Sequence, residues 1–536
     1  MRFWTKTTKS ARLGVCATLA AIALTAAACG SGGGSSSTGG STGASGTPKQ
    51  GGSLTVLEGS GFAGQWPAGL DPATNTNGAA NQPYMDSIYG QMFELGSGGK
   101  IIPDMATGYT ITNGGKTYTL TLRPGVKFTD GTPFNAQAVV WNIQRDLKSA
   151  CTCKPLWPVT SVKAIGSDKV QINLATVYAP MIDSFIDSNA DWIASPTAVQ
   201  KLGEQAFRLH PVGAGPFIVT SNTPNSVMVL KKNPHYWKTG HPFLNQLTFK
   251  SVSSDEAAYE AMLAGEGQVY EDMSTPALLK QAGQHFHVQN ELSTSPYDLQ
   301  FNTAIPPFNN IKARQAIYAA TNFTPILQHI FQNLYPQTQS FTAPGGICYQ
   351  PKVPGYPTYD LAKAKALVKE LGGLTVNLGT INVLVAKETT QALQTEWAAA
   401  GIKTTINAWD LGPLIAQFTG GKWQAMIQTA GAYDPAAGVG VGFRFSSKSP
   451  FSGVHDPHLD SLLNQAAGTL NLSQRCQLYG QAAQYIAQQA YGPFYFSFAP
   501  ANIAAKNVAG PGLTSPLSSV VVTPNIPYED VGFTSG

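Results

Sequence analysis

Few residue patterns in this 536-residue chain could carry covalent chemistry. One G-x-S-x-G motif, the pattern of a hydrolase nucleophile elbow, runs from Gly39 to Gly43. It lies in a Gly/Ser-rich stretch, whereas an elbow needs a strand, a sharp turn and a helix around its serine. We find no H-E-x-x-H zinc motif and no interpretable pair of catalytic carboxylates in the sequence. The sequence therefore argues against an enzyme, and a secreted hydrolase is the least favoured alternative.

Two short-spaced pairs have the residue types of a metal site. His455 and His458 flank an Asp-Pro dipeptide, and Cys151 and Cys153 flank a threonine. Asp-Pro before an apolar-periodic segment is typical of a turn and helix cap, and no third ligand is visible near either pair. We therefore predict neither a metal site nor a cofactor.

Apart from Cys16 and Cys29, which belong to the N-terminal pattern described below, the chain has four cysteines: Cys151, Cys153, Cys348 and Cys476. An exported location permits disulfides. Cys348 with Cys476 is one possible bridge, but connectivity cannot be read from spacing alone.

The elements that must position any site alternate between strands and helices. Leu54 and Val56 indicate a first strand, and Asn113-Gly-Gly115 between alternating apolar runs predicts a hairpin. Helices are expected from Asn135 to Leu147, after a cap at Asp360, after Thr324-Pro325, and from Gln391 to Ala400. A strand should follow at 402–406. This alternation predicts an α/β fold with no solenoid repeat.

The N-terminus has the layout of a secretory signal peptide. Four cations precede an apolar run that ends in Ala26-Ala-Ala28 before Cys29. Small residues before a cysteine resemble the lipobox of bacterial lipoproteins, so we expect cleavage after residue 28 and lipidation of Cys29. Plain secretion, with cleavage near the same alanines, is the alternative.

A tether of almost only Gly, Ser and Thr follows, from Gly30 to about Gly46. Such a stretch cannot bury a core and should span roughly 20–25 Å as a flexible coil. The four leader cations account for the formal net charge of +4, so the remaining chain is neutral overall. A neutral chain lacks the basic surface that nucleic-acid binding requires, and we expect no nucleic-acid partner.

Eight segments together resemble one family, the extracellular solute-binding proteins of ABC importers that take dipeptides, oligopeptides or nickel (family 5). In chain order, the segments are 118–136, 210–217, 233–237, 265–269, 301–316, 359–367, 396–402 and 528–531. The signature is clearest in Tyr118-Thr-Leu-Thr-Leu-Arg-Pro-Gly125 and in Gly213-Ala-Gly-Pro-Phe217. The match covers roughly Gly51 to Phe533.

The resemblance implies a two-lobed flytrap of the periplasmic-binding-protein type. The leader is residues 1–28 and the tether 29–50. Lobe I is expected from 51–70, 211–290 and 500–536, with an extra subdomain at 71–210. Lobe II is expected at 291–499. The ligand would lie between the lobes, which close about a hinge and present the loaded form to a permease.

The resemblance also indicates where a ligand would be held. In peptide-binding relatives, an aspartate clamps the peptide ammonium at the position of Gly431, and a tryptophan is usual at Gln428. Dipeptide binders place an arginine for the ligand carboxylate before the Glu396-Trp helix, where this chain has only Lys387 and Glu388. The scaffold is kept while these specificity positions differ.

Six further residues are candidates for ligand contact. Tyr433 offers a stacking face and a hydroxyl, and Asp434 a carboxylate, although Asp-Pro is also ordinary turn chemistry. Trp409 and Asp410 end a strand and could face the cleft, and core packing is the alternative for Trp409. Glu58 and Trp66 lie in or beside a Gly-rich loop of lobe I, where the cleft should open.

The sequence thus predicts a monomeric, lipid-anchored binding protein on the outer face of the cytoplasmic membrane. Its partners would be a small solute, peptide-like by family frequency, and the permease subunits of an ABC importer. A surface lipoprotein with a sensing or structural role is the main alternative.

Overall fold

The computed structural model describes residues 46–59, 69–75, 81–96, 99–149, 158–429, 431–437, 440–449, 451–499, 501–520 and 523–535. The chain divides into two units, Met1–Gly40 and Ser41–Gly536, and every described residue belongs to the second. Cys29, Trp66, Cys151 and Cys153 lie outside the described residues, so what the sequence predicts for them stays a prediction.

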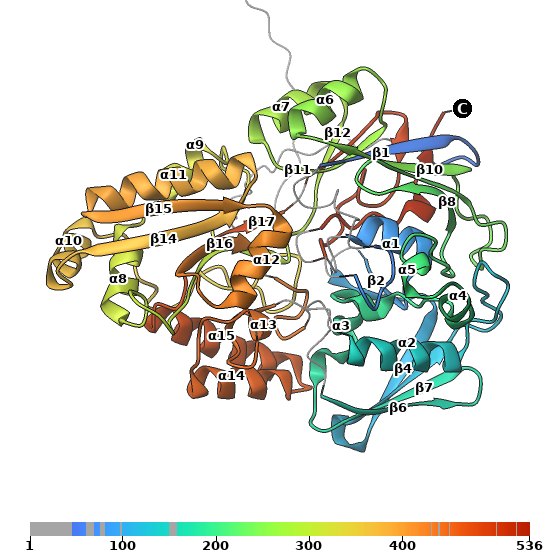
Figure 1. The fold of residues 1–536 in the computed structure, drawn as a ribbon, viewed down its shortest axis with the longest axis horizontal. Coiled ribbons are helices and arrows are strands. Elements are labelled where there is room, and N and C mark those ends of the chain that lie inside the picture. Colours follow the sequence, from blue (N-terminus) through green and yellow to red (C-terminus); the bar gives the residue numbers. More distant parts are fainter. Residues whose placement is uncertain are drawn as a thin grey trace, which may run out of the picture. The chain divides into compact units, whose positions relative to one another are not determined.

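A seven-stranded sheet, which with its helices we name lobe I, has the order β12-β18-β11-β1-β10-β9-β8 (Figure 1). Its central strand β1 (Ser53–Gly59) runs parallel to β10 (Gln246–Val252) and β11 (Val269–Met273). The antiparallel strands are β8 (Phe217–Thr223), β9 (Val227–Lys232), β12 (His287–Asn290) and β18 (Ala501–Ala504).

Both faces of this sheet are buried. On β1, Leu54 and Val56 pack into one hydrophobic core. Leu57, the residue that precedes Glu58, packs into a second core. The helices that complete these cores are α1 (Gln82–Tyr89), α4 (Pro196–Leu202), α5 (Glu204–Phe207), α6 (Asp255–Leu263) and α7 (Pro276–His285). A residue at the carboxyl end of β1 is therefore enclosed from both sides.

An antiparallel four-stranded sheet, which with α2, α3 and β2–β3 we name the subdomain, has the order β4-β5-β7-β6. Its elements are β2 (Phe93–Leu95), β3 (Ile101–Pro103), β4 (Ala106–Thr112), β5 (Thr117–Leu122), α2 (Ala136–Lys148), β6 (Val159–Ile165), β7 (Lys169–Leu174) and α3 (Asp183–Ile186). The predicted hairpin is confirmed: Asn113, Gly114 and Gly115 all have positive φ between β4 and β5. Single-turn 3₁₀ segments occupy Asn113–Gly115, Ala179–Met181 and Asn189–Asp191.

A five-stranded mixed sheet, which with its helices we name lobe II, has the order β15-β14-β16-β13-β17 (Figure 1). Its strands are β13 (Ser295–Phe301), β14 (Leu374–Ile381), β15 (Ile402–Trp409), β16 (Ala425–Thr429) and β17 (Phe494–Phe498). Its helices are α8 (Ile311–Ala320), α9 (Phe323–His329), α10 (Leu361–Glu370), α11 (Leu384–Ala399), α12 (Leu411–Gly420), α13 (Val441–Phe445), α14 (Pro457–Ala467) and α15 (Leu472–Gln488).

Most local signals have the predicted effect. Asn135 and Asp360 each accept a hydrogen bond from the third residue of their helix, and Asp456 between the two histidines caps α14. Two boundaries differ from the prediction. Helix α9 begins after Asn322 rather than Thr324, and α11 begins at Leu384, seven residues before Gln391. Val383 precedes α11 and gives no capping signal, so the sequence does not mark that start.

Of the two disulfide candidates among the described residues, both belong to the same bridge. Cys348 and Cys476 form a disulfide with their Cα atoms 5.0 Å apart. It ties the segment before α10 of lobe II to the N-terminal part of α15. Short strands β19 (Val508–Ala509) and β20 (Gly532–Phe533) pair near the C-terminus, next to a 3₁₀ turn at Tyr528–Asp530.

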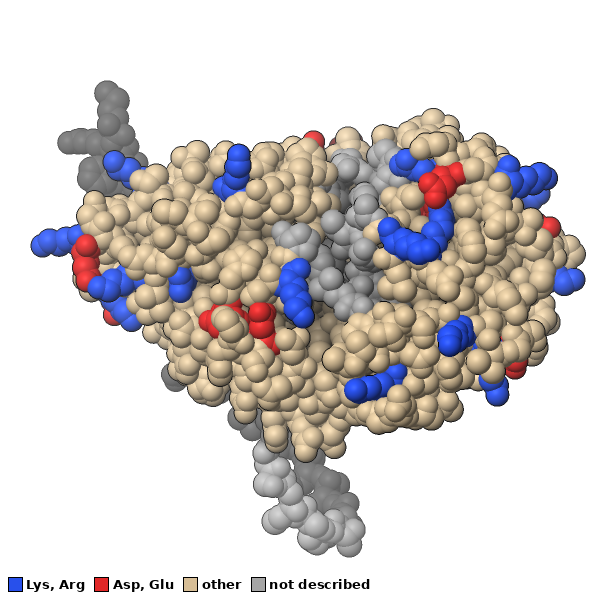
Figure 2. Space-filling view, turned by 60° about the horizontal axis from the view of Figure 1, so that its bottom comes forward, with Lys and Arg blue, Asp and Glu red and all other residues tan. Residues whose placement is uncertain are grey.

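Charged side chains are sparse on the face shown in Figure 2, where they stand singly or in small groups on a largely uncharged surface. Among the described residues, no helix combines the length and apolar character needed to cross a bilayer. In the same part of the chain, no three His, Cys, Asp or Glu side chains are arranged to hold a metal ion.

Candidate ligand-binding site

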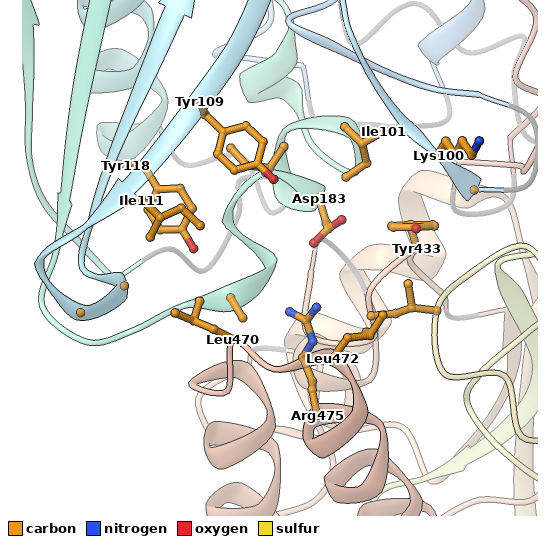
Figure 3. Close-up of a pocket in the computed structure, with 16 residues that line it drawn as sticks. Lys100, Ile101, Tyr109, Ile111, Tyr118, Asp183, Tyr433, Leu470, Leu472 and Arg475 are labelled. Carbon is orange, nitrogen blue, oxygen red and sulfur yellow. The ribbon is translucent and has the colours of Figure 1, made fainter.

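A cavity of about 820 Å³ lies between the subdomain and lobe II (Figure 3). Its subdomain wall includes Gly99, Lys100, Ile101, Tyr109, Ile111, Tyr118, Ile182 and Asp183. Its lobe II wall consists of Ile347, Tyr433, Leu470, Leu472 and Arg475. A volume of this size falls within the range of small-molecule sites, and both parts of the chain must be present to form it.

The rim of the cavity is apolar and open to solvent. Tyr109 and Ile111 on β4 are 45% and 40% exposed, and Leu470 and Leu472 at the turn into α15 are 46% and 49% exposed. Large apolar side chains this exposed are not stabilised by burial in the fold itself. They offer apolar surface that a ligand can cover.

The centre of the cavity is charged. Arg475 on α15 is 9% exposed, and its NH1 lies 3.1 Å from Oδ2 of the fully buried Asp434. The Tyr479 hydroxyl and the Ala436 amide both donate to Oδ1 of Asp434, at 2.5 and 3.0 Å. In Figure 3 the guanidinium of Arg475 points toward Asp183 of the subdomain.

Burial raises the pKa of these acids. The pKa of Asp183 is raised to about 8, first by burial and then by the charge of Asp434, while Arg475 acts in the opposite direction. Burial likewise raises the pKa of Asp434, against the pull of Arg475 and the Tyr479 hydrogen bond. Because the charge of Asp434 raises the pKa of Asp183, the ionisation of one acid opposes that of the other.

Two hydrogen bonds join the subdomain to lobe II beside the cavity. The Tyr178 hydroxyl donates to the carbonyl of Ala436 at 2.8 Å, and the Tyr433 amide donates to Oδ2 of Asp187 at 3.2 Å. Tyr433 also packs against the subdomain core. Both parts of the chain therefore hold the loop 431–437 from opposite sides.

The structure brings two of the predicted site residues, Tyr433 and Asp434, to this cavity. Tyr433 lines the wall, and burial raises the pKa of its hydroxyl to about 12, so it stays a donor. Asp434 lies behind the wall and holds Arg475. It also accepts from the Ala436 amide, which is the turn chemistry expected of Asp-Pro.

Gly431 lies where close packing leaves no room for a side chain. A Cβ there would lie 2.0 Å from the Thr294 carbonyl oxygen and 2.4 Å from the Ser295 Cα. An aspartate could therefore not replace Gly431 on this backbone without moving β13. The packing of lobe II around Gly431 is therefore incompatible with the aspartate that clamps the peptide ammonium in peptide-binding relatives.

Gln428 belongs to a buried polar layer on the sheet of lobe II. Its amide donates to Gln300 at 2.5 Å, and its carbonyl accepts from Arg444 at 2.8 Å. Asp298, opposite Gln428 in the β13–β16 register, is fully buried, and burial raises its pKa to about 8. Gln428 thus contacts its own lobe, and its contact with a ligand stays a prediction.

Trp409 and Asp410 are not among the residues that line the described cavity. Trp409 is half-buried and packs against the cluster around Phe418 and Met426. Asp410 is exposed and accepts from the side-chain amide of Asn382 at 3.1 Å. The packing of Trp409 against this cluster supports the alternative that its side chain belongs to the core of lobe II.

Glu58 is fully buried at the carboxyl end of β1, paired in register with Glu271 on β11. Neither of its carboxyl oxygens has a hydrogen-bond partner among the described residues. Burial, followed by the charge of Glu271, raises the pKa of Glu58 well above its usual value. Ligands bind at the carboxyl ends of parallel strands in open α/β sheets, and Glu58 lies at such an end. Contact of Glu58 with a ligand stays a prediction.

The sequence did not single out Asp183, Asp187 or Arg475. Asp183 and Asp187 lie on and after a helix of four residues, and Arg475 lies in the first turn of a long polar helix. No motif links positions so far apart in the chain. Only the fold brings them together.

Comparisons with known proteins agree with this architecture. The model of bacterial extracellular solute-binding proteins, family 5, matches residues 100–450. The glutathione-binding protein GsiB of Salmonella typhi is 31% identical over 366 residues, which are 66% of this chain and 69% of that protein. The chain belongs to this family.

Solved structures confirm the two-lobed α/β fold expected from the sequence. The periplasmic binding protein DppA of Helicobacter pylori, in complex with the peptide STSA, has a TM-score of 0.77 at 20% identity, covering 91% of this chain and 99% of its own. A dipeptide-binding protein of Pseudoalteromonas sp. SM9913, in complex with Met-Leu, gives 0.76 at 21% identity, covering 89% and 100%. The chain is a solute-binding protein of the ABC-importer type rather than an enzyme.

Proposed function

We propose that this family 5 protein captures a peptide-like solute in the cavity between the subdomain and lobe II and delivers it to an ABC permease. The cavity carries the proposal, because it joins a charged centre to an apolar rim and draws on two parts of the chain that are far apart in sequence. The similar proteins are named for glutathione and short peptides, which agrees with a ligand of this size and polarity.

The predicted division of the chain is part of the proposal. Lobe I would comprise residues 51–70, 211–290 and 500–536, the subdomain 71–210, and lobe II 291–499. Relative motion of these parts would open the cavity, and the contacts of Tyr433 and Tyr178 across it would re-form on closure. Tyr433 and Asp434 are the predicted site residues that the cavity supports best.

The location is also proposed. Cleavage before Cys29 and lipidation of its thiol would hold a monomer on the outer face of the cytoplasmic membrane. The Gly/Ser tether would then let the folded part reach the permease. Incorporation of labelled palmitate into the wild-type protein, and its loss in Cys29→Ala, would test the anchor.

Native mass spectrometry of the gently purified protein, before and after unfolding and refolding, tests solute capture. A small co-purifying mass that is lost on refolding supports capture and identifies the ligand class. Calorimetry with glutathione and short peptides follows on the stripped protein. A clean mass together with no heat for any of these solutes would instead favour a sensing or structural role.

A further inference from the structure

Arg475 has unused hydrogen-bonding capacity. Its guanidinium carries five N–H donors, yet Nε and NH1 have no hydrogen-bond partner among the described residues. The 3.1 Å contact of NH1 with Asp434 is an ion pair without hydrogen-bond geometry. Because Nε and NH1 are enclosed by the protein, a ligand in the cavity would meet the guanidinium at NH2, the nitrogen that is not among the enclosed atoms.

Asp434 lies against the enclosed part of this guanidinium, with its Oδ2 3.1 Å from NH1. One of its oxygens already accepts from the Tyr479 hydroxyl and the Ala436 amide. These two contacts fix the carboxylate below the cavity and place the guanidinium in the cavity wall. Asp434 thus positions Arg475, and the open side of the guanidinium faces the volume that a ligand would fill (Figure 3).

The opposite wall suits an anion. Asp183 faces Arg475 across the cavity, and with a pKa of about 8 it carries its proton at neutral pH and is a donor. The other charged or titratable groups at this point are Asp187, whose pKa is also raised by burial, Tyr433 and Lys100. A bound carboxylate would meet a guanidinium from lobe II and a carboxylic acid proton from the subdomain.

We propose that Arg475 is the carboxylate anchor of the cavity, so that the protein selects acids whose apolar part covers Tyr109, Ile111, Leu470 and Leu472. This inference rests on the proposed solute capture and names the ligand class of the same site. Planar, two-pronged donors are the usual partners of carboxylates, and apolar rim residues add contact area beside them.

The anchor accounts for a departure seen in the sequence. The arginine that dipeptide binders use before the Glu396-Trp helix is absent, and Lys387 stands in that segment. Lys387 donates to Asn382 at 3.2 Å and does not line the cavity. On this proposal the carboxylate contact comes from α15 rather than from the segment of Lys387.

Three related probes separate the acid from the amine. Leu-Leu, N-acetyl-Leu-Leu and Leu-Leu amide are titrated into the stripped protein by calorimetry at pH 7. We expect both free acids to bind, and the amide to bind at least about tenfold more weakly because it lacks the charged partner of Arg475. An amide that binds as tightly as the acids, or failure of both acids to bind, would overturn the inference.

Variants test the residue itself. Arg475→Lys keeps the charge next to Asp434 but loses the fork, so affinity for N-acetyl-Leu-Leu should fall about tenfold while the unfolding midpoint changes little. Arg475→Met should abolish binding, with circular dichroism as the check on folding. Lys403→Met, an exposed site on β15, is the matched control. Unchanged affinity in a folded Arg475→Lys protein would contradict the anchor.

The pH dependence gives a readout that a structural arginine would not move. Because protonated Asp183 donates to the bound carboxylate, affinity for N-acetyl-Leu-Leu should fall as pH rises from 6.5 through about 8. Asp183→Asn keeps a donor without the titration, so its affinity should be flat, while Asp168→Asn on the β6–β7 turn should behave like wild type. Affinity that rises with pH, or that does not change across this range, would mean that Asp183 is not a donor to the bound carboxylate, and the inference would be wrong.

The two proposals fail differently. A co-purifying ligand without an acid group would leave solute capture intact and overturn the carboxylate anchor. Absence of any ligand and of any binding would instead count against solute capture.

Discussion

Two groups of buried acids lie in opposite settings in this molecule. Asp183 and Asp434 border a cavity and share the cation of Arg475. Glu58 and Glu271 lie side by side on β1 and β11 of lobe I. Among the described residues, the Tyr528 hydroxyl is the group that lowers the pKa of Glu271 against its burial.

The difference teaches that a raised pKa does not by itself mark a site. Burial raises the pKa in both groups, since desolvation always penalises a carboxylate. What separates them is the open volume that Asp183 and Arg475 line, whereas Glu58 and Glu271 are enclosed in lobe I. Changes in the first group should therefore alter binding, and changes in the second should alter stability.

The largest effect is expected for Asp434→Ala. The change leaves the Arg475 cation without its partner and removes the acceptor of the Tyr479 hydroxyl, so the free energy of unfolding should fall by roughly 3–5 kcal/mol. Urea unfolding followed by circular dichroism measures it. Asp410→Ala, at an exposed acid of the same lobe, should cost well under about 1 kcal/mol. Equal losses in both variants would show that the ion pair does not stabilise lobe II.

The disulfide should come next. Replacing Cys348 and Cys476 together by serine frees a closed segment of 128 residues, and the free energy of unfolding should fall by roughly 2–4 kcal/mol. Because Ile347 and Arg475 of the cavity wall adjoin these cysteines, affinity should fall as well. Calorimetry and unfolding of wild type with and without reductant provide the control. Loss of stability with intact affinity would show that the bridge does not hold the wall in place.

Glu271→Gln sharpens the comparison from lobe I. Burial raises the pKa of Glu271 from its ordinary value of 4.5 to about 8 in the folded protein. Between these two pH values the folded protein therefore keeps a proton on Glu271 that the unfolded chain has lost. The contribution of Glu271 to the free energy of unfolding is thus fully present below pH 4.5 and is lost as the pH rises to about 8. Glutamine keeps an acceptor for Tyr528 without ionising. The variant should match wild type at pH 4.5 and exceed it by on the order of 2 kcal/mol at pH 8.5.

Urea unfolding at several pH values measures this difference, with the exposed Glu388→Gln as control. Affinity for the co-purified ligand should not change in Glu271→Gln. Parallel stability curves for variant and wild type would contradict the raised pKa, and a loss of affinity would move the ligand toward lobe I.

The smallest effect is expected for Tyr433→Phe. The backbone contact to Asp187 and the packing of the ring remain, and only a hydroxyl donor in the cavity is lost. Affinity should fall by about tenfold or less, with no change in the unfolding midpoint. Calorimetry beside Tyr359→Phe, an exposed control, measures it. A complete loss of binding would make the hydroxyl, rather than Arg475, the main anchor.

Local sequence signals predicted more of the fold than of the candidate site. The Asn113-Gly-Gly turn and the caps at Asn135 and Asp360 act within a few residues, so their consequences could be read from the sequence. The start of α11 could not, because it depends on tertiary packing rather than on a cap.

Of the described residues that border the candidate cavity, the sequence singled out Tyr433 and Asp434. Asp183 and Arg475 come from distant segments and become neighbours through the packing of the subdomain on lobe II. The tight fit of Gly431 against Thr294 is likewise invisible without the fold. Chemistry that arises from long-range packing leaves no local pattern in the chain.

The two hydrogen bonds between the subdomain and lobe II have a consequence for how such proteins diversify. On the lobe II side, both use main-chain groups, the Tyr433 amide and the Ala436 carbonyl. Any amino acid other than proline at position 433, and any at all at 436, supplies these groups. Side chains on this loop can therefore change from one descendant to the next, and with them the preferred solute, while the hydrogen bonds across the cleft persist.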